Sequence, residues 1–336
     1  MDDVALSAPA AARQVPARTI ATPRTASPQL QRFIAAAASA PLGDLSRAPE
    51  TAEKWRAFVA ANAQLGLKRV AAIGAMYPCD VAETQMDGVT VRWITPASLD
   101  PVKTGRVLMH LHGGGYVLSP GEAGLSEGLL CAHFACTPVI SVDYRMPPDH
   151  PFPAAIDDAI TVWRALIRTH APASVGVFGA SAGGGLLLAM TSRLKALGLP
   201  LPGALAPNTP WADLEGESDS YAVNALVDSI LPQYDGVAAA MARLYAGATS
   251  LRDPLISPVH ADFTGFPPSI LTTGTRDLLL SDTVRVYRAM RAVGVEARLE
   301  VYEALSHAEY NYAFDSPETA STFTDIGRFF ERHLTA

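Results

Sequence analysis

The sequence predicts an α/β fold in which a mostly parallel central sheet carries helices on both faces. Two observations lead to this prediction. Short, almost continuously apolar segments alternate with amphipathic segments of helical period over most of the 336 residues, and strands of that kind are typical of a sheet that is covered on both faces. Apolar residues make up 49% of the chain and charged residues 18%, an ordinary balance for a globular protein.

Each expected element is recognised by its own residue pattern. The region 28–73 is rich in alanine and places large apolar residues at helical spacing, whereas 89–95 alternates apolar and polar residues as a strand does. Further strands are expected at 106–112, 138–144, 175–179, 204–207, 268–273 and 297–302. Helices are expected at 122–135, 153–170, 182–197, 282–293 and 318–333.

Two helical regions do not fit the strand-helix alternation, and both predict a cap above the sheet. One is the alanine-rich N-terminal region, and the other is a stretch rich in Ala, Tyr and Met between two strands. We therefore expect a poorly ordered arm at 1–27 and a helical cap segment at 28–80. A catalytic domain is expected at 81–336, with 213–248 as a helical cap insertion.

Charge and hydropathy exclude some partners. The formal net charge is -7 and the basic residues are scattered, which argues against nucleic acid as the main partner. No apolar run approaches the ~18 residues of a membrane span. Met1 is followed by two aspartates, which is unlike a secretory signal. A cytoplasmic location and export to the periplasm, with a leader absent from this sequence, both stay open.

The three cysteines, Cys79, Cys131 and Cys136, follow no metal-ligand spacing. Their odd number leaves at least one free thiol. We expect them to be small buried hydrophobic residues without a structural disulfide. Since no His, Cys, Asp and Glu cluster has ligand spacing, no metal is expected.

The segment Gly179-Ala-Ser-Ala-Gly183 matches the G-x-S-x-G pattern and lies between an expected strand and an expected helix. Such a turn is so sharp that it needs small neighbours, and it lifts the Ser181 hydroxyl above the edge of the sheet. The following helix directs its positive end at the same place. The alternative interpretation is a glycine-rich turn of some other α/β protein.

A second glycine-rich segment, His112-Gly-Gly-Gly115, ends the expected strand 106–112. Glycines let backbone N–H groups approach a carbonyl closely, which is what stabilisation of a developing oxyanion requires. The N–H of Ala182 would supply a further donor. A nucleotide-binding loop is the alternative, but no Lys-Ser/Thr pair follows the glycines.

An acid and a base are expected after the nucleophile, in that order. Asp277 lies just past one expected strand and His307 just past the next, both at the edge of the sheet where ligands bind. His110 and His112 are rival bases, but they are expected to shape the glycine loop.

Asp282 is a rival to Asp277 for the role of the acid. It follows Ser281 at the expected start of a helix, where a carboxylate caps the N–H groups of the first turn. We therefore expect Asp282 to be structural and Asp277 to orient the base.

Together these motifs resemble the bacterial members of the hormone-sensitive lipase family, which are carboxylesterases of the α/β-hydrolase fold. The resemblance rests on segments 112–115, 143–158 and 179–184, and on the order of Asp277 and His307. It extends from about residue 106 to the C-terminus. It implies a carboxylic-ester hydrolase with a cap domain and no cofactor. It also implies an oxyanion hole formed by three backbone groups, those of Gly114, Gly115 and Ala182.

The chain departs from the family pattern at several positions around the site. Ala180 stands where Asp or Thr is usual, and Pro147 and Asp149 replace Ala and Glu. Ala308 and Glu309 follow the base where Gly and Phe are usual. None of these changes removes a catalytic group, but each bears on pocket shape and substrate preference.

The predicted function is hydrolysis of short-chain carboxylic esters through an acyl-enzyme, with Ser181 as nucleophile, His307 as base and Asp277 as its orienting acid. A lactonase, an amidase and an acyltransferase share this machinery and stay open as alternatives. A binding protein on an inactive hydrolase scaffold is a further alternative, but it would lack the nucleophile or the base.

The substrate is expected to be a small-molecule ester held beneath the cap, with Tyr116 and Trp211 as pocket candidates. Aromatic residues in the cap regions would close a compact apolar pocket around a short acyl group. These residues are Trp55, Phe58, Trp211, Tyr221, Tyr234 and Tyr245. The sequence leaves a homodimer open.

Overall fold

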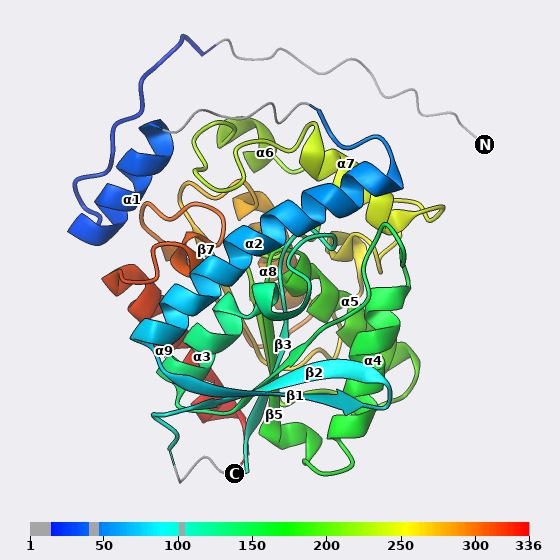
Figure 1. The fold of residues 1–336 in the computed structure, drawn as a ribbon. Coiled ribbons are helices and arrows are strands. Elements are labelled where there is room, and N and C mark those ends of the chain that lie inside the picture. The colour runs from blue at the N-terminus through cyan, green and yellow to red at the C-terminus, as the bar shows by residue number, and fades with distance from the viewer. Residues whose placement is uncertain (1–14, 40–46, 101–104, 336) are drawn as a thin grey trace.

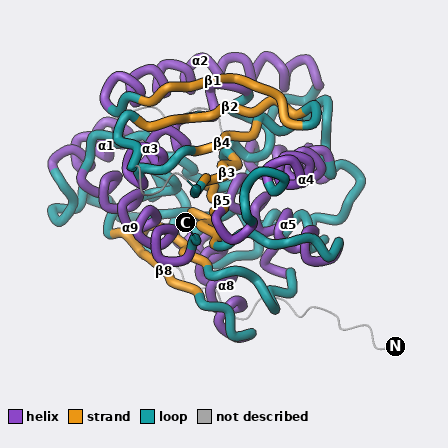
Figure 2. The backbone as a smooth tube through the Cα atoms, turned by 90° about the horizontal axis from the view of Figure 1, so that it is seen from below, coloured by secondary structure: helices purple, strands orange, loops and turns teal. Residues whose placement is uncertain are grey.

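The computed structural model of the chain describes residues 15–39, 47–100 and 105–335, and within them eight strands form one sheet. The strand order is β1-β2-β4-β3-β5-β6-β7-β8, and Figure 2 shows the strands lying between helices. β1 (Cys79–Met86) and β2 (Val89–Pro96) pair in antiparallel fashion, and β2 is also antiparallel to β4. All other pairings are parallel. The predicted mostly parallel sheet is therefore confirmed.

The remaining strands are short, and most of them are completely buried. They are β3 (Val107–Leu111), β4 (Val139–Val142), β5 (Val175–Ala180), β6 (Ala204–Asn208), β7 (Ser269–Gly274) and β8 (Ala297–Tyr302). Every residue of β3 to β7 is buried, whereas β8 at the edge of the sheet is partly exposed. Their ends agree with the expected strands to within a few residues, because a strand covered on both faces needs an unbroken apolar run.

The sequence analysis did not predict β1. Most of its side chains are exposed and they show no apolar alternation. β1 is a strand because it pairs along its whole length with β2, from Met86 opposite Val89 to Cys79 opposite Pro96. Asp87 and Gly88 join the two strands, both with positive φ, which is the backbone of a tight hairpin turn. The Asp-Gly dipeptide is the one local signal for this hairpin.

Helices cover both faces of the sheet. α4 (Ala154–Leu166), α5 (Ala182–Ala196) and α8 (Leu280–Ala292) pack on one face, and α3 (Ser126–Ala135) and α9 (Pro317–His333) pack on the other. Successive residues of a strand point to opposite faces. Met109 of β3 accordingly belongs to the first core, and the adjacent Leu108 belongs to the second.

The N-terminal helices are α1 (Pro28–Ser39) and the longer α2 (Ala52–Met76), which crosses in front of the sheet in Figure 1. Of the predicted arm 1–27, only 15–27 lies within the described residues, and it contains neither helix nor strand. Ser27, at its end, donates from its backbone N–H and its hydroxyl to Glu318 of α9, at 2.7 Å each.

The segment 213–248 differs from the expected helical insertion. It is helical only in α6 (Ser220–Val223) and α7 (Val237–Ala246), and the rest consists of turns and loops. Pro232 and the positive φ of Gly216 and Gly236 interrupt helical structure there. In Figure 1, α6 and α7 lie at the top of the molecule beside α2.

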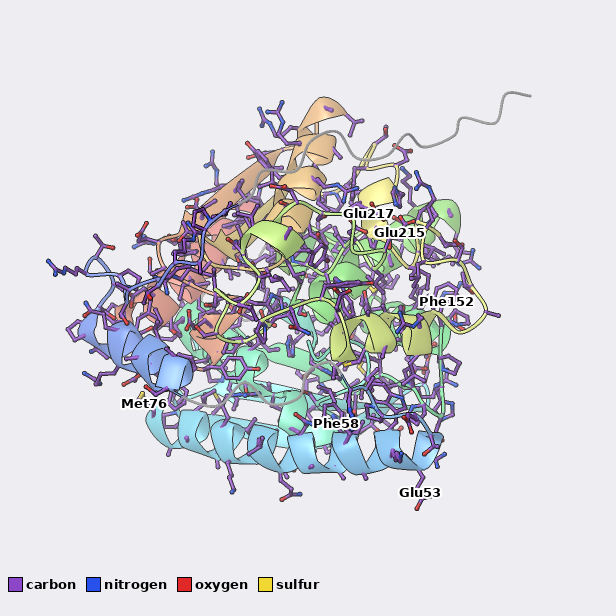
Figure 3. All side chains as sticks on the ribbon, turned by 90° about the horizontal axis from the view of Figure 1, so that it is seen from above. Glu53, Phe58, Met76, Phe152, Glu215 and Glu217 are labelled. Carbon is purple, nitrogen blue, oxygen red and sulfur yellow. The ribbon has the colours of Figure 1, made fainter. Side chains whose placement is uncertain are left out.

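Helix α2 begins at Thr51, whose side chain caps the helix by accepting a hydrogen bond from the N–H of Lys54 at 3.2 Å. Glu53 and Met76 mark its two ends in Figure 3, which shows it running along one side of the molecule. At its middle, Gly66 lies directly on Ala123, so that a Cβ at Gly66 would be 2.9 Å from the Ala123 carbonyl oxygen. The absence of a side chain at Gly66 therefore sets how closely α2 approaches the segment around Ala123.

Two glycines of α2 provide a matched pair of substitutions. Gly66→Ala is expected to lower the free energy of unfolding by ~1–3 kcal/mol, because α2 must move away from a backbone atom. Gly74→Ala is expected to raise it by roughly 0.5–1 kcal/mol, because the same methyl group meets nothing within 4 Å and alanine favours the helix. Urea unfolding monitored by circular dichroism measures both changes. Equal effects of the two substitutions would contradict this account of how α2 docks.

Candidate active site

Ser181 lies at the sharp turn between β5 and α5, as predicted, with φ 58° and ψ −123°. This backbone conformation is rare for a residue with a side chain and is held by its surroundings. The Ser181 N–H donates to the Asn208 carbonyl at 3.0 Å, and the Ser181 carbonyl accepts from the N–H of Trp211 at 2.8 Å. Because α5 starts at Ala182, the positive end of the helix lies beside the serine.

The flanking glycines of the turn make room for β3. A Cβ at Gly179 or at Gly183 would overlap the carbonyl oxygen of Leu111, the last residue of β3. The turn and the end of β3 are therefore in direct backbone contact. This contact explains why the pattern requires glycine at both positions.

The glycine loop (His112–Gly115), which follows β3, is held against the same turn. A Cβ at Gly113 would lie 2.9 Å from the Ala180 carbonyl oxygen. Gly114 and Gly115 have φ of 114° and 62°, a region that favours glycine. Within the part of the chain that the structure describes, no group accepts a hydrogen bond from the N–H of either residue. These two donors are therefore available to a ligand next to Ser181.

Asp277 and His307 are brought together as the sequence predicted. Nδ1 of His307 is 3.1 Å from Oδ1 of Asp277, and both residues are buried. Oδ1 of Asp277 also accepts from the N–H of Leu279 at 2.8 Å. Its other oxygen accepts from two hydroxyl groups, that of Thr273 at 2.6 Å and that of Thr209. Sequence reasoning missed both threonines, which have no motif of their own.

The electrostatics of this pair favour its charged form. Burial by itself would raise the pKa of Asp277, but the hydrogen bond and charge of His307 and the two threonine hydroxyls lower it. Burial by itself would lower the pKa of His307, but Asp277 raises it through its hydrogen bond and its charge. Asp277 therefore stabilises a proton on His307, as the partner of a general base does.

The rival histidines have other roles. Nδ1 of His112 donates to the Gly113 carbonyl at 2.7 Å, and its ring stacks on Tyr144, as expected of a residue that shapes the glycine loop. Burial lowers the pKa of His112 to about 4, so its ring is neutral at neutral pH. His110 lies deeper, where its Nδ1 is 2.9 Å from the Ser141 hydroxyl.

Sequence reasoning also missed the buried Glu127 of α3. Its Oε2 accepts from the N–H of Ala180, immediately before the serine, at 2.8 Å. Its Oε1 accepts from the side-chain amide of Asn208 at 2.9 Å. Glu127 thus holds the backbone just before Ser181 and the side chain of Asn208 in place. An acidic residue within an otherwise apolar helix is the signal that could have found it, because a buried carboxylate needs donors nearby.

Asp282, the rival acid, does not cap α8 as the sequence predicted. The helix starts at Leu280 without a side-chain cap, and Asp282 is completely buried in its first turn. One of its oxygens accepts from the N–H of Ala212 at 3.0 Å and of Asp213 at 2.9 Å. Burial raises the pKa of Asp282 to about 7. The side chain therefore faces the chain beyond β6 rather than the N–H groups of its own helix.

Ser181 and His307 both line a cavity of about 290 Å³. Gly113, Gly114 and Gly115 line it as well, and Gly113 lies against Ser181. One wall is mainly apolar and comes from the region between β6 and α8. Its side chains are those of Trp211, Tyr221, Ile230, Leu231, Tyr234, Ala238, Met241 and Leu279. The lining also contains polar side chains from α2, α3 and the residues after His307. They are Asn62, Arg69, Ser126, Glu127, Asn311 and Tyr312.

The two pocket candidates differ in their placement. Trp211 lines the cavity, but Tyr116 does not. Tyr116 is buried and its ring stacks on that of Tyr245, with 3.8 Å between the ring centroids. The glycine loop turns at Gly115, so the next side chain points into the core. Of the other cap aromatics, Tyr221 and Tyr234 line the cavity, while Trp55, Phe58 and Tyr245 pack outside its lining.

The described residues contain neither a metal-binding cluster nor a membrane-spanning helix. No group of three or more His, Cys, Asp or Glu side chains there is arranged to hold a metal ion. No helix among them is both long and apolar enough to cross a bilayer. The three cysteines, all within the described residues, are free.

The fold and the site define an α/β protein with a serine at a strand-to-helix turn, a buried Asp-His pair and free N–H donors around one cavity. Comparison with known families agrees: residues 108–311 match the model of a family described as having the alpha/beta hydrolase fold. The chain belongs to this family, and its predicted resemblance to bacterial hormone-sensitive lipases is confirmed by the structures to which it is similar.

Among curated proteins, the chain is similar to an acetyl-hydrolase of Streptomyces hygroscopicus, with 33% identity over 241 residues, 71% of this chain and 79% of that protein. Among solved structures it is similar to esterase E25, with a TM-score of 0.93, 38% identity and coverage of 96% of this chain and 99% of the other. It is also similar to an esterase from the bacterial hormone-sensitive lipase family, with a TM-score of 0.77, 29% identity and coverage of 92% and 99%.

The positions of Asp277 and Asp282 predict different consequences of the same substitution. Asp277→Asn is expected to lower kcat on p-nitrophenyl acetate by about 10⁴-fold, because the amide no longer holds the required tautomer of His307. Asp282→Asn is expected to keep most of kcat and to lower the free energy of unfolding by ~1 kcal/mol, because an amide oxygen still accepts from the two N–H groups. Steady-state kinetics and urea unfolding measure the two effects. A catalytically dead Asp282→Asn beside an active Asp277→Asn would reverse the assignment.

Proposed function

We propose that the protein is a serine carboxylesterase that hydrolyses short-chain carboxylic esters through an acyl-enzyme intermediate. The observation that carries the proposal is that Ser181, on its strained turn, lines the same cavity as His307, whose Nδ1 is bound to the buried Asp277. The names of similar proteins, an acetyl-hydrolase and esterases, support the same reaction class.

The proposed mechanism assigns one role to each group. Because Nδ1 of His307 is held by Asp277, Nε2 is the nitrogen left to accept the Ser181 proton as the hydroxyl attacks the ester carbonyl. The carbonyl oxygen becomes an oxyanion, which accepts from the N–H groups of Gly114, Gly115 and Ala182. His307 then protonates the departing alcohol.

Hydrolysis of the acyl-enzyme repeats these steps with water. His307 takes a proton from the water as the water oxygen attacks the acyl carbonyl. The same N–H donors bind the oxyanion. The proton then passes from His307 to the Ser181 oxygen as the carboxylic acid leaves. The imidazole must be neutral to act as a base in both halves. Activity is therefore expected to be lost on the acid side, as the pH falls through the pKa of His307.

A preference for short acyl groups follows from the size of the cavity. At about 290 Å³ it lies at the lower end of the ~300–1,000 Å³ that small-molecule sites span. The apolar wall formed by Trp211, Ile230, Leu231 and Met241 is the part that suits an acyl chain. A lactone or an amide would use the same groups, so matched esters, lactones and amides assayed with one preparation separate these activities.

The nucleophile is tested by Ser181→Ala. Turnover of p-nitrophenyl acetate is expected to fall by about 10⁶-fold, because the triad loses its nucleophile. A fluorophosphonate probe is expected to label the wild-type protein but not the variant. Ser119 lines the same cavity and provides the matched control, since Ser119→Ala is expected to keep both labelling and activity. Retention of more than about a thousandth of the activity in Ser181→Ala would contradict the assignment.

The acyl preference is tested with p-nitrophenyl esters from acetate to palmitate. We expect the highest kcat/KM on acetate or butyrate, because longer chains exceed the apolar wall. Met241→Ala, which shortens a side chain of that wall, is expected to move the preference toward longer chains. A wild-type optimum at laurate or beyond, or activity that jumps on emulsified substrate, would refute the proposed chain length.

A further inference from the structure

The insertion 213–248 contains a buried carboxylate, Asp228, which lies between α6 and α7 and is 3% exposed. It accepts four backbone hydrogen bonds. Oδ1 accepts from the N–H of Ile230 and from that of Leu231, both at 2.8 Å. Oδ2 accepts from the N–H of Leu278 at 2.7 Å and from the N–H of His307 at 3.0 Å. Nothing in its local sequence indicates these last two partners.

The four donors belong to three different parts of the site. Leu278 directly follows Asp277, the acid, and His307 is the base itself. Ile230 and Leu231 belong to the apolar wall of the cavity. One carboxylate therefore joins the acid loop, the base loop and the wall of the substrate cavity.

Neighbouring residues of the insertion reinforce both connections. The side-chain amide of Asn224 donates to the Asp277 carbonyl at 2.8 Å. On the other side, the Ser229 N–H donates to the Ser306 hydroxyl at 3.1 Å, and the Ser229 hydroxyl is 3.2 Å from Oε1 of Glu309. The segment 224–231 thus connects the loop that carries Asp277 with the loop that carries His307. The cap insertion is therefore hydrogen-bonded to the loops of Asp277 and His307.

We propose that Asp228 is a positioning residue of the esterase site, which fixes the loops of Asp277 and His307 relative to each other and places a second negative charge beside the base. This inference rests on the proposed function of Ser181, Asp277 and His307. Asp228 itself does not touch the reacting atoms. It acts through the backbone of the two loops and through its charge.

The charges around His307 make the electrostatic part measurable. Burial disfavours the imidazolium, and Asp277, Asp228 and Asp282 together outweigh this effect and raise the pKa of His307. The carboxyl of Asp228 has a pKa of about 6, raised by burial and by Asp277, so it is ionised at neutral pH. Glu309, whose pKa burial raises to about 7, is a further acid near Asp228. Removal of the Asp228 charge therefore lowers the pKa of His307 while Asp277 still holds Nδ1.

The principal test is Asp228→Asn, which keeps the shape of the side chain. An amide presents one oxygen, so one of the two pairs of N–H donors must face an NH₂ group instead. We expect kcat on p-nitrophenyl acetate to fall between about 10- and 100-fold, as for a small misplacement of catalytic groups. We also expect the acid limb of the kcat/KM profile to move to lower pH, because the base loses a stabilising negative charge.

Two further variants separate positioning from charge. Asn224→Ala removes the neutral contact to the acid loop, so it is expected to lower kcat without moving the acid limb. Asp235→Asn removes a charge from an exposed position of the same insertion. It is expected to change neither kcat nor the position of the acid limb. Circular dichroism and thermal unfolding establish that each variant is folded. If Asp228→Asn fails to fold, Asn224→Ala still tests whether the insertion positions the acid loop.

Several results would overturn the proposal. The first is a folded Asp228→Asn variant that keeps the wild-type kcat. The second is an Asp228→Asn variant in which the acid limb of the kcat/KM profile stays in place or moves to higher pH. A wild-type kcat in Asn224→Ala would overturn the part of the proposal that assigns positioning of the acid loop to the Asn224 contact. These failures are distinct from failure of the proposed function, since wild-type turnover and its loss in Ser181→Ala are measured in the same assay. A wild-type protein without Ser181-dependent turnover would remove both proposals.

Discussion

The contact between the strand-to-helix turn at Ser181 and the end of β3 is the constraint on which the site depends. Two glycines of the turn face the same carbonyl oxygen, that of Leu111, and any side chain there would separate the two strands' ends. Because β3 and β5 are neighbouring parallel strands, this contact places the glycine loop beside the serine. The strained backbone of Ser181 is thus held by the contact with β3 and by the hydrogen bond from the N–H of Ala180 to Glu127.

A second theme is the number of carboxylates buried at this edge of the sheet. Glu127 accepts from the turn at Ser181, Asp277 binds His307, Asp282 holds the chain beyond β6, and Asp228 joins the loops that carry Asp277 and His307. Each accepts hydrogen bonds from N–H or hydroxyl donors, which offsets part of the cost of burying it. Removing such a carboxylate leaves buried donors unpaired. Because the donors of one carboxylate come from segments that are far apart in sequence, each carboxylate fixes the relative positions of those segments. Their combined charge also favours a proton on His307.

The cap regions are part of this site rather than a separate cover. α2 rests on the rest of the fold through the close approach of Gly66 to Ala123, and it contributes Asn62 and Arg69 to the lining of the cavity. The insertion contributes most of the apolar side chains of the lining and is hydrogen-bonded to the loops of Asp277 and His307. The shape of the cavity and the arrangement of the Asp-His pair consequently depend on the same loops. Substrate preference and catalytic geometry are therefore expected to respond together to changes in the cap.

The sequence by itself determined the order of the buried strands and helices, the turn at Ser181, the glycine loop and the pairing of His307 with Asp277. These features follow from local periodicity, from backbone conformations that only glycine adopts readily, and from the order in which strand ends carry polar residues. Only the tertiary structure decided that β1 is a strand, that Tyr116 turns into the core and that Asp282 faces Ala212 and Asp213. It alone revealed Glu127 at the turn of Ser181 and Asp228 between the loops of Asp277 and His307. The physical reason is that each of these depends on contacts with residues distant in the chain, and such contacts leave no periodic or local pattern to read.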